Sequence, residues 1–515
     1  MSSSMVRGKY VISHVVDKDQ SVVINDGAVF QVDGEIIDVG EFGKLRSKYD
    51  PDEIIGSEKE MVIPGLINAH HHVGLTPFQL GNKDLPLETW GATRGSTRDV
   101  DPYLDTLYCA IQMIESGITT VMHNHGLNRL PENLTLHELG FEVLKAYQDS
   151  GMRVAFSFGI RDQNQVVYHD DQEFLSTLPS DLAKMIKEGL ERSRLSAGDY
   201  HSLVTDMRRK FGDNAPDQRI MHFFSPTNVQ WCSDEMLLQI KEFASKIGTG
   251  IHIHLHETIY QKMYGYRYYG KTPLAHLHDL GFTGNEVSCA HGVWLTDNDI
   301  GLLAETGTMV CHNASSNLRL QSGVMPLNGL LAQDVTVAIG IDEAGINDDN
   351  DMLQEMRLVQ KIHRVPGISS SSPTSHQVLH MATVNGAKAT FFEDRVGTLE
   401  PGKRADLVLL DLEHITEPYL DPDTSPVDAL LYRGKGQGVN TVIVDGEVLL
   451  RNRQLTRVNK DEVWAELKSR LSKDLEPYEV KRKHVARRLV PYIQQFYEKW
   501  PMDRVKPHYY FNESQ

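Results

Sequence analysis

Short apolar runs alternate with longer amphipathic segments through the middle of this 515-residue chain. The apolar runs, each of four to eight residues, occupy positions 61–68, 119–123, 154–158, 220–224, 250–254, 287–290, 308–311 and 335–340. Between most of them, apolar residues recur with the period of an α-helix, as over 104–114 and 237–247. Strands that alternate with helices predict a parallel sheet covered by helices on both faces.

Eight strand–helix units favour an α/β fold in which the sheet closes into a (β/α)8 barrel of the TIM type. The alternative is an open, doubly wound sheet. It is disfavoured because no glycine-rich dinucleotide loop follows the first strand.

The two ends of the chain carry short β-strands instead. Strands within 5–60 are separated by the turn sequences Asn25-Asp26-Gly27 and Asp33-Gly34, and similar strands return at 405–411 and 441–450. We expect these two groups to pair into one small β-sandwich. The predicted division is 1–60 for the first part of the sandwich, 61–395 for the barrel, 396–456 for the second part and 457–515 for a C-terminal helical extension. Residues 161–219 read as a long insertion with helices of its own.

Composition narrows the class of protein. The formal net charge of −18 disfavours nucleic-acid binding, which needs a basic surface. No apolar run is long enough to span a bilayer, and the N-terminus lacks the apolar segment of a signal peptide. The four cysteines form no CxxC pair, which argues against a thiolate zinc site and against a disulfide framework. We expect a cytoplasmic protein that acts on a small molecule, without a membrane or nucleic-acid partner.

Histidines stand where the first barrel strand ends. Side chains alternate along a strand, so His70 and His72 point the same way and His71 points opposite. Two neutral imidazoles on one face are suitable ligands for Zn²⁺ or a similar metal. Other strands of the predicted barrel also end in polar residues, which are His252, His254, His291, His312 and Asp342. The alternation alone does not choose between His252 and His254.

Several motifs resemble those of the amidohydrolase superfamily, in the branch of cytosine deaminase, S-adenosylhomocysteine deaminase and the triazine hydrolases. They are 64–72 (PGLINAHHH), 84–90 (DLPLETW), 117–120 (GITT), 254–257 (HLHE), 290–296 (AHGVWLT), 312–320 (HNASSNLRL), 340–342 (GID) and 397–407 (GTLEPGKRADL). They follow the order of the family from about residue 60 to residue 410.

The resemblance implies a role for each matching position. The metal ligands would be His70, His72, His254 and Asp342, and Asp342 would also take a proton from the metal-bound water. His291 would contact the substrate or the water, and Glu257 would carry a proton to the leaving group. Metal-activated water would then attack an electron-poor carbon, a carboxylic acid would protonate the departing amine, and a cationic His291 would stabilise the developing charge.

Bimetallic members of the superfamily bridge two metals with a carbamylated lysine on the fourth strand, and residues 219–226 contain no lysine. We therefore expect one divalent metal ion per subunit. Zinc is expected first, with iron, cobalt and manganese as alternatives. Relatives of this kind are often homo-oligomers, and we expect the same here, with the aromatic tail 500–511 at the interface.

Two positions depart from the family pattern. Glu343 follows Asp342 where the family usually has glycine, and its carboxylate either binds a cationic or hydrogen-bond-donating group of the substrate or turns outward. His125 ends the second strand, either in the pocket or in a supporting position. Together with Trp90 and Asn317, these residues form the predicted substrate-binding set.

The leading hypothesis is a mononuclear metal-dependent hydrolase that removes an amine from an N-heterocyclic small molecule. The alternative within this class is hydrolysis of an amide, urea or carbamate bond in a small aromatic or N-alkyl compound. From another class, a non-catalytic scaffold requires lost metal ligands, whereas every expected ligand position is filled here.

Overall fold

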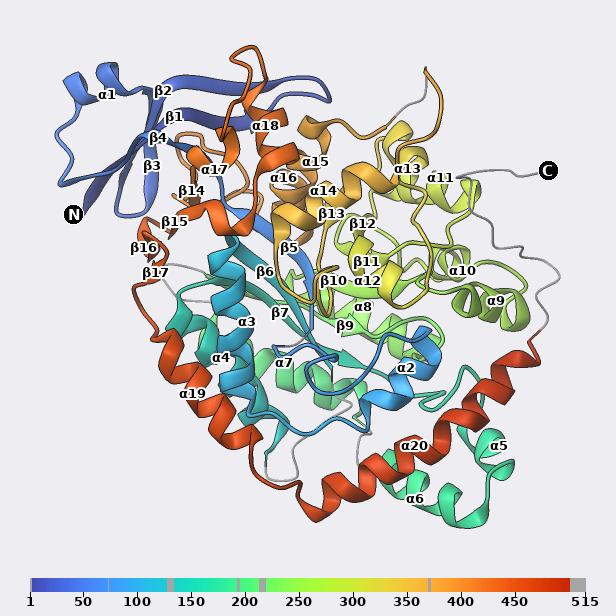
Figure 1. Ribbon diagram of the computed structural model, residues 1–515. Coiled ribbons are helices and arrows are strands. Elements are labelled where there is room, and N and C mark those ends of the chain that lie inside the picture. The colour runs from blue at the N-terminus through green and yellow to red at the C-terminus, as the bar shows by residue number, and fades with distance from the viewer. Residues whose placement is uncertain are drawn as a thin grey trace.

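The computed structural model describes residues 2–72, 74–126, 134–191, 195–212, 219–368 and 372–500, and Figure 1 shows how their helices and strands are arranged. Within these residues, the middle of the chain forms two parallel sheets. The first has the order β5 (Leu66–His71), β6 (Ile118–Gly126), β7 (Arg153–Ile160) and β8 (Ile220–His222), and β9 (Ser225–Pro226) also pairs with β7. The second has the order β10 (Ile251–Leu255), β11 (Val287–His291), β12 (Met309–His312) and β13 (Val337–Ile339).

Isolated parallel bridges join these two sheets at both outer edges. Phe224, just after β8, pairs with Ile251 at the start of β10. His71, at the end of β5, pairs with Asp342, just after β13. The carboxyl ends of β5 and β13 therefore meet, although these strands lie far apart in the sequence. The α/β class and the parallel pairing predicted from the sequence are confirmed.

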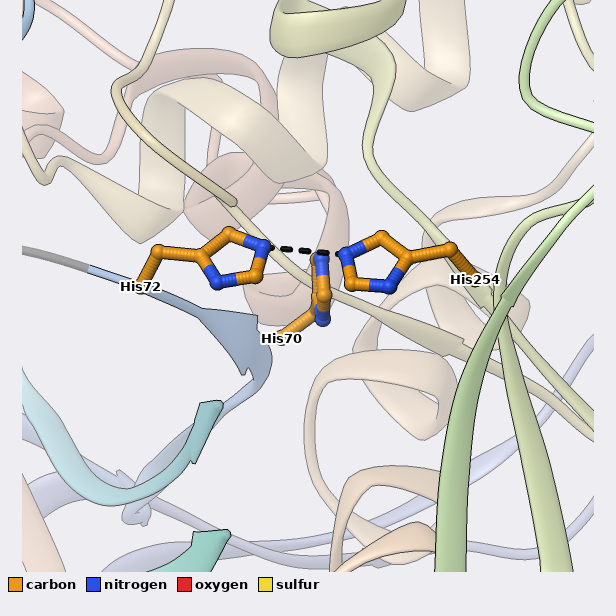
Figure 2. A group of neighbouring side chains, drawn as sticks. All are labelled: His70, His72 and His254. Carbon is orange, nitrogen blue, oxygen red and sulfur yellow. Dashed lines mark hydrogen bonds between the residues drawn. The ribbon is translucent and has the colours of Figure 1, made fainter. Parts of the chain in front are cut away.

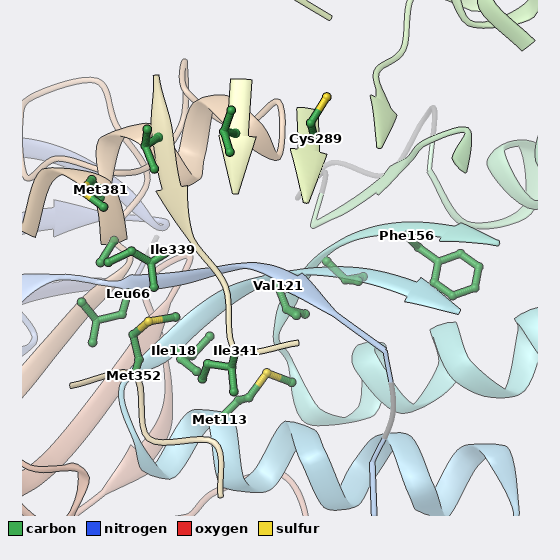
Figure 3. Packing of buried hydrophobic residues seen from close by; sticks show 14 of the residues in the cluster. Leu66, Met113, Ile118, Val121, Phe156, Cys289, Ile339, Ile341, Met352 and Met381 are labelled. Atoms are coloured by element: carbon green, nitrogen blue, oxygen red, sulfur yellow. The ribbon is translucent and has the colours of Figure 1, made fainter. Parts of the chain in front are cut away.

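Helices alternate with these strands. Their bounds are α3 (Pro102–Glu115), α4 (Leu136–Ser150), α8 (Asp234–Ile247), α9 (Ile259–Tyr268), α10 (Pro273–Asp279), α11 (Asp297–Thr306), α12 (Ala314–Arg319), α13 (Leu327–Ala332), α14 (Met352–Ile362), α15 (Ser375–Ala382) and α16 (Val384–Ala389). The apolar stripe predicted over 104–114 is buried on α3. Asp101 caps that helix by accepting a hydrogen bond from the backbone N–H of Leu104. Figure 3 shows part of the core, in which Met113 of α3 packs in one buried cluster with Leu66 and Ile118.

The two ends of the chain meet in one further sheet. In the described residues its order is β17 (Gln454–Leu455), β16 (Glu447–Arg451), β15 (Val439–Val444), β14 (Leu407–Asp411), β4 (Glu53–Pro64), β1 (Ser3–Val15), β2 (Ser21–Val32) and β3 (Glu35–Glu41). The N-terminal and C-terminal groups join where β4 and β14 run antiparallel. α1 (Phe42–Lys48) packs against β2 and β3, and the C-terminal part of this region also contains α17 (Glu413–Thr416), α18 (Pro426–Arg433) and the short η1 (Gly436–Gly438).

One of the two predicted hairpin turns is wrong. Asp33 and Gly34 do turn the chain between β2 and β3, with φ of 49° and 81°. Asp26 instead lies inside the continuous strand β2, with φ of 41°, and pairing with β1 continues on both sides of it. The same turn-type residues here make a local irregularity in a long strand.

Gly65 marks the point where the chain passes from the terminal sheet to β5. β4 ends at Pro64 and β5 begins at Leu66, so the apolar run 61–68 is divided between two sheets. A Cβ on residue 65 would lie 2.2 Å from Oγ1 of Thr119, which leaves room only for glycine.

The C-terminal extension packs against the insertion. It contains α19 (Lys460–Leu471) and the long α20 (Pro477–Glu498), which lies in Figure 1 beside α2 (Leu87–Arg94), α5 (Asp171–Ser176) and α6 (Ser180–Glu191). α7 (Ala197–Phe211) completes the insertion. Tyr168 and Leu182 of the insertion share a buried cluster with Leu489 and Tyr497 of α20. Trp500 is buried in the same cluster, and the rest of the predicted aromatic tail lies outside the described residues. No described helix combines the length and apolar character needed to cross a membrane.

A buried ion pair connects β7 to the terminal sheet, and its removal should destabilise the fold. Nε and Nη2 of Arg153, a fully buried side chain, lie 3.2 and 3.1 Å from the carboxylate of Asp406, which immediately precedes β14. Arg153→Met leaves the buried carboxylate of Asp406 without its cation, and we expect the free energy of unfolding to fall by about 3–5 kcal/mol. Urea unfolding measures this free energy. The control is Arg451→Met, which removes an exposed pair with Glu53 and should cost below about 1 kcal/mol. Equal effects in the two variants would contradict the prediction.

Candidate active site

The two histidines of the first strand turn their Nε2 atoms to a common point. Nδ1 of His70 lies 2.7 Å from Nε2 of His252, whose own Nδ1 lies 2.6 Å from the hydroxyl of Ser288. This chain of hydrogen bonds fixes the ring of His70, and its buried Nε2 has no hydrogen-bond partner in the described residues. His252 therefore orients the ring of His70 through this hydrogen bond and is not one of the residues that face Nε2 of His72.

His72 and His254 face each other across 3.0 Å, the contact drawn as a dashed line in Figure 2. Nδ1 of His72 lies 2.5 Å from the carbonyl oxygen of Asn124, and Nδ1 of His254 lies 2.8 Å from that of Thr227. A carbonyl oxygen only accepts, so each Nδ1 carries the proton and each neutral ring has a lone pair on Nε2. Two facing lone pairs repel, and a shared cation removes that repulsion. This donor set therefore fits a metal ion.

Asp342 completes the cluster. Its Oδ1 lies 3.5 Å from Nε2 of His70 and 3.3 Å from Nε2 of His72, while Oδ2 accepts a hydrogen bond of 2.6 Å from Ser316. Burial acts to raise the pKa of this carboxyl. The electrostatic contacts with His70, His72 and His291 outweigh burial and hold the pKa of Asp342 well below its ordinary value. Asp342 is therefore an anion ready to bind a cation.

His291 and Glu257 stand beside this cluster. Nε2 of His291 lies 3.8 Å from Oε2 of Glu257 and 3.9 Å from Oδ2 of Asp342. Burial, followed by the charges of Asp342 and Glu88, raises the pKa of Glu257 well above its ordinary value. Burial also lowers the pKa of His291. Burial therefore disfavours the cationic form of His291 that the sequence analysis expects, whereas Asp342 and the hydrogen bond to Asn317 favour it, so the charge of this ring stays a prediction.

Left-handed backbone occurs at or near three strand ends around the site. The φ angles are 54° at His256, 79° at His291 and 64° at Asp342, values that non-glycine residues seldom adopt. Such conformations cost about 1–3 kcal/mol each and persist where the surrounding structure holds them. Here hydrogen bonds to Asn317 and Ser316 of α12 hold His291 and Asp342 respectively.

The four predicted substrate-binding residues lie in different settings. Asn317 is buried, and its Oδ1 lies 2.9 Å from Nδ1 of His291, so it touches the site through that ring. His125 is partly buried beside His123, at 3.2 Å between ring nitrogens. Burial, then the charges of His72 and Arg94, lowers the pKa of His125 to about 4.

The other two, Glu343 and Trp90, both contact Arg94. Glu343 does not turn outward, because it is buried and forms an ion pair with Arg94. The guanidinium of Arg94 lies 4.9 Å from the ring centroid of the buried Trp90, one helical turn earlier on α2. Sequence reasoning missed Arg94, although its position four residues after Trp90 places both side chains on one helix face.

Ligand-type atoms converge in overlapping groups within the described residues. The groups are His70 with His72 and His254, His70 with His291 and Asp342, and His72 with Asp342 and Glu343, and in each group the atoms lie within 4.8 Å of one another. A mixed set of imidazoles and carboxylates is typical of zinc and similar divalent ions.

The amidohydrolase family profile matches residues 61–449. The chain belongs to the amidohydrolase family, and the resemblance noted in the sequence is confirmed. It is 31% identical to a 5'-deoxyadenosine deaminase of Methanosarcina barkeri over 90% of this chain and 96% of the relative. It is also 31% identical to a 5-methylthioadenosine/S-adenosylhomocysteine deaminase of Caldanaerobacter subterraneus subsp. tengcongensis, over 86% of this chain and 93% of the relative.

Solved structures share the fold. An adenosine deaminase from Xanthomonas campestris with bound zinc matches with a TM-score of 0.76 and 25% identity, over 91% of this chain and 97% of that chain. An atrazine chlorohydrolase from Arthrobacter aurescens complexed with zinc matches with a TM-score of 0.75 and 21% identity, over 90% of this chain and 99% of that chain. At this identity, the second likeness concerns the fold alone.

A buried glutamate on α14 supports the helix that carries Ser316 and Asn317, and it should make stability depend on pH. Glu355 accepts hydrogen bonds from the backbone N–H and the hydroxyl of Ser315. Burial raises the pKa of Glu355 from 4.5 to about 7, against the lowering effect of these hydrogen bonds.

Below pH 4.5 this carboxyl is protonated in both the folded and the unfolded state. As the pH rises from 4.5 to 7, the unfolded state loses the proton more readily, so the free energy of unfolding falls by about 3 kcal/mol. Glu355→Gln should remove this loss. Relative to the parent, its stability should rise across that pH range in urea unfolding. The exposed Glu58→Gln serves as control, and a difference that does not change with pH would refute the prediction.

Proposed function

We propose that this chain is a mononuclear metal-dependent hydrolase that removes an amino group from an N-heterocyclic small molecule. The observation that carries the proposal is the pair of Nε2 atoms of His72 and His254, which face each other with their lone pairs at 3.0 Å beside the anionic Asp342. Family membership and relatives described as deaminases support the same reaction class.

In this proposal the metal ligands are His70, His72, His254 and Asp342. A divalent ion held by these residues would supply activation of water, by lowering its pKa toward about 7. One ion is expected because residues 219–226 contain no lysine to bridge a second. Zinc is the first choice, since the Xanthomonas campestris adenosine deaminase was described with zinc.

The chain's own groups would handle the protons. Asp342 accepts the proton from the attacking water, because its Oδ1 is buried and free of hydrogen bonds from the described residues. Burial raises the pKa of Glu257 well above its ordinary value and so favours the protonated form, which would donate to the departing nitrogen, a group too basic to leave without a proton. His291, whose ring is held by the contact between its Nδ1 and Oδ1 of Asn317, would present Nε2 to the substrate or the water.

The substrate class follows from the relatives, whose descriptions specify 5'-deoxyadenosine, 5-methylthioadenosine and S-adenosylhomocysteine. We propose an aminated N-heterocycle of this general kind. Hydrolysis of an amide, urea or carbamate is the alternative chemistry, and it would release an amine together with an acid or CO₂.

We also propose that the two parallel sheets close into one (β/α)8 barrel. The bridges Phe224–Ile251 and His71–Asp342 support it, because they connect both pairs of outer strands. For the terminal strands we propose a sandwich. The bridge between Glu35 and Arg404 supports it, because it brings β3, an outer strand of the sheet, to the segment that leads into β14. The domain limits 1–60, 61–395, 396–456 and 457–515 stay predictions.

A cytoplasmic location and a homo-oligomer remain our expectations. The cysteines at 109, 232, 289 and 311 are all buried and unpaired, which suits a reducing compartment.

Metal content tests the ligand assignment. Protein made without added metal should contain about one metal ion per chain by elemental mass spectrometry. His254→Ala should lose most of it. His252→Ala, the matched control on the same strand, should retain the ion with about 10- to 100-fold weaker affinity in chelator competition, because it removes only the support of His70. Two ions per parent chain, or none after incubation with Zn²⁺, would refute the assignment.

Replacement of Glu257 tests the proton donor. Glu257→Gln keeps the size of the side chain but has no acidic proton, so kcat for ammonia release should fall about 10²- to 10⁴-fold while metal content stays at the parent level. Glu305→Gln, exposed on α11, is the control and should retain the parent rate. A loss below tenfold for Glu257→Gln would show that another group supplies the proton.

A further inference from the structure

One carboxylate oxygen in the site lacks a donor. Glu343 is 7% exposed, and its buried Oε2 has no hydrogen-bond partner in the described residues. A carboxylate oxygen of this residue lies within 4.8 Å of a ring nitrogen of His72 and a carboxylate oxygen of Asp342. A buried acceptor without a donor is costly, so this oxygen points to a ligand group that supplies one.

The backbone explains why two consecutive carboxylates share the site. Successive side chains of an extended strand point to opposite faces. Asp342 lies three residues beyond the end of β13, and its φ of 64° departs from the extended backbone in which that alternation holds. Asp342 and Glu343 therefore both lie beside His72, and the strain at Asp342 maintains an arrangement that regular strand geometry would not allow.

Arg94 fixes the second carboxylate. Its guanidinium forms an ion pair with Oε1 of Glu343 and lies over the ring of Trp90, with 4.9 Å from the guanidinium carbon to the centroid. The positive charge offsets the repulsion between Glu343 and Asp342, and the stacking on Trp90 limits the movement of the guanidinium. Only Oε2 of Glu343 is then left to meet a ligand.

We propose that Glu343, held by Arg94, is a specificity-determining residue that accepts a hydrogen bond from a second N–H donor of the substrate, close to the carbon that loses its amino group. The inference rests on the proposed function and specifies its substrate as an N-heterocycle with a further amino group or ring N–H next to the reacting carbon. Arg94 is a positioning residue that acts through Glu343.

The position of Glu343 restricts where that donor belongs. Its carboxylate lies among the proposed metal ligands, so the donor is within a few bonds of the carbon that water attacks. A hydroxyl on a distant substituent would not reach it once that carbon is in place. A ring with two amino groups around one ring nitrogen has the required spacing.

Matched pairs of ligands that differ by one amino group test the proposal. The pairs are 4-aminopyrimidine with 2,4-diaminopyrimidine, adenine with 2,6-diaminopurine, and 2-amino-1,3,5-triazine with 2,4-diamino-1,3,5-triazine. Calorimetry on zinc-loaded protein carrying Glu257→Gln, which slows turnover, gives Kd. We expect at least one diamino compound to bind about 10- to 100-fold more tightly than its partner, as expected for a hydrogen bond to a charged acceptor.

Variants of the ion pair isolate the cause. Adding Glu343→Gln should bring the ratio of Kd values within a ligand pair to less than threefold. Arg94→Met should reduce the preference for the diamino ligand. Arg94→Lys should restore part of that preference. Arg451→Met, which breaks an exposed pair with Glu53, should leave it unchanged. All variants should keep the parent metal content. The proposal is overturned if no pair shows a preference, if Glu343→Gln preserves it, or if that variant loses metal and so identifies a metal ligand.

The same ligands separate this inference from the proposed function. If the parent enzyme releases ammonia from monoamino and diamino members at equal kcat/KM, the deaminase assignment stands and the inference fails. If the protein binds diamino ligands selectively but releases no ammonia from any of them, the inference stands and the reaction assignment fails.

Discussion

The arrangement of the site depends on two imidazoles whose lone pairs face each other. The rings of His72 and His254 both give their Nδ1 protons to backbone carbonyls, at Asn124 and Thr227. Those carbonyls belong to β6 and to the segment after β9, so the sheet itself determines the tautomers. Neither ring can satisfy the other at 3.0 Å without a proton or a metal ion between them. Burial disfavours a proton there by lowering the pKa of His254 well below its ordinary value. A metal ion is then the species that this geometry accommodates, and the remaining groups of the site are arranged around that position.

Several residues maintain this arrangement at a cost in local stability. Asp342 and His291 adopt left-handed backbone. Asp342 accepts a hydrogen bond from Ser316 of α12, and Nδ1 of His291 donates one to Oδ1 of Asn317 on the same helix. α12 is in turn tied to α14 by the buried Glu355, whose raised pKa shows that burying this carboxyl is unfavourable. Strain and desolvation are therefore concentrated around the site, while the two parallel sheets and their apolar core provide the compensating stability. A more relaxed set of strand ends would turn at least one of these side chains away from the metal position.

Sequence patterns predicted the metal-type cluster because strand ends are strong signals. Apolar runs lead to His70, His72 and Asp342. Another run ends in His252 and His254, and the resemblance to the family selected His254. The structure brings the four expected ligands together. Sequence patterns did not predict local conformation or side-chain environment where backbone angles or burial determine them. Asp26 has the composition of a turn yet lies inside β2, because long-range pairing with β1 outweighs the local preference. The lowered pKa of His291 and the inward position of Glu343 depend on burial and on φ at Asp342, which the spacing of residues in the sequence does not reveal.

The position of Arg94 depends on contacts that no local pattern contains. Arg94 ends α2, which packs against α20 from the far end of the chain. Just after α2, Asp99 accepts hydrogen bonds from Arg482 at 2.6 Å and from Tyr478 at 3.0 Å. Arg482 also donates to the carbonyl of Thr97. The C-terminal extension therefore holds the segment that carries Trp90 and Arg94 beside Glu343. Because the ion pair at Glu343 requires α2 to stay in that place, the substrate side of the site is coupled to the packing of a helix almost 400 residues further along the chain.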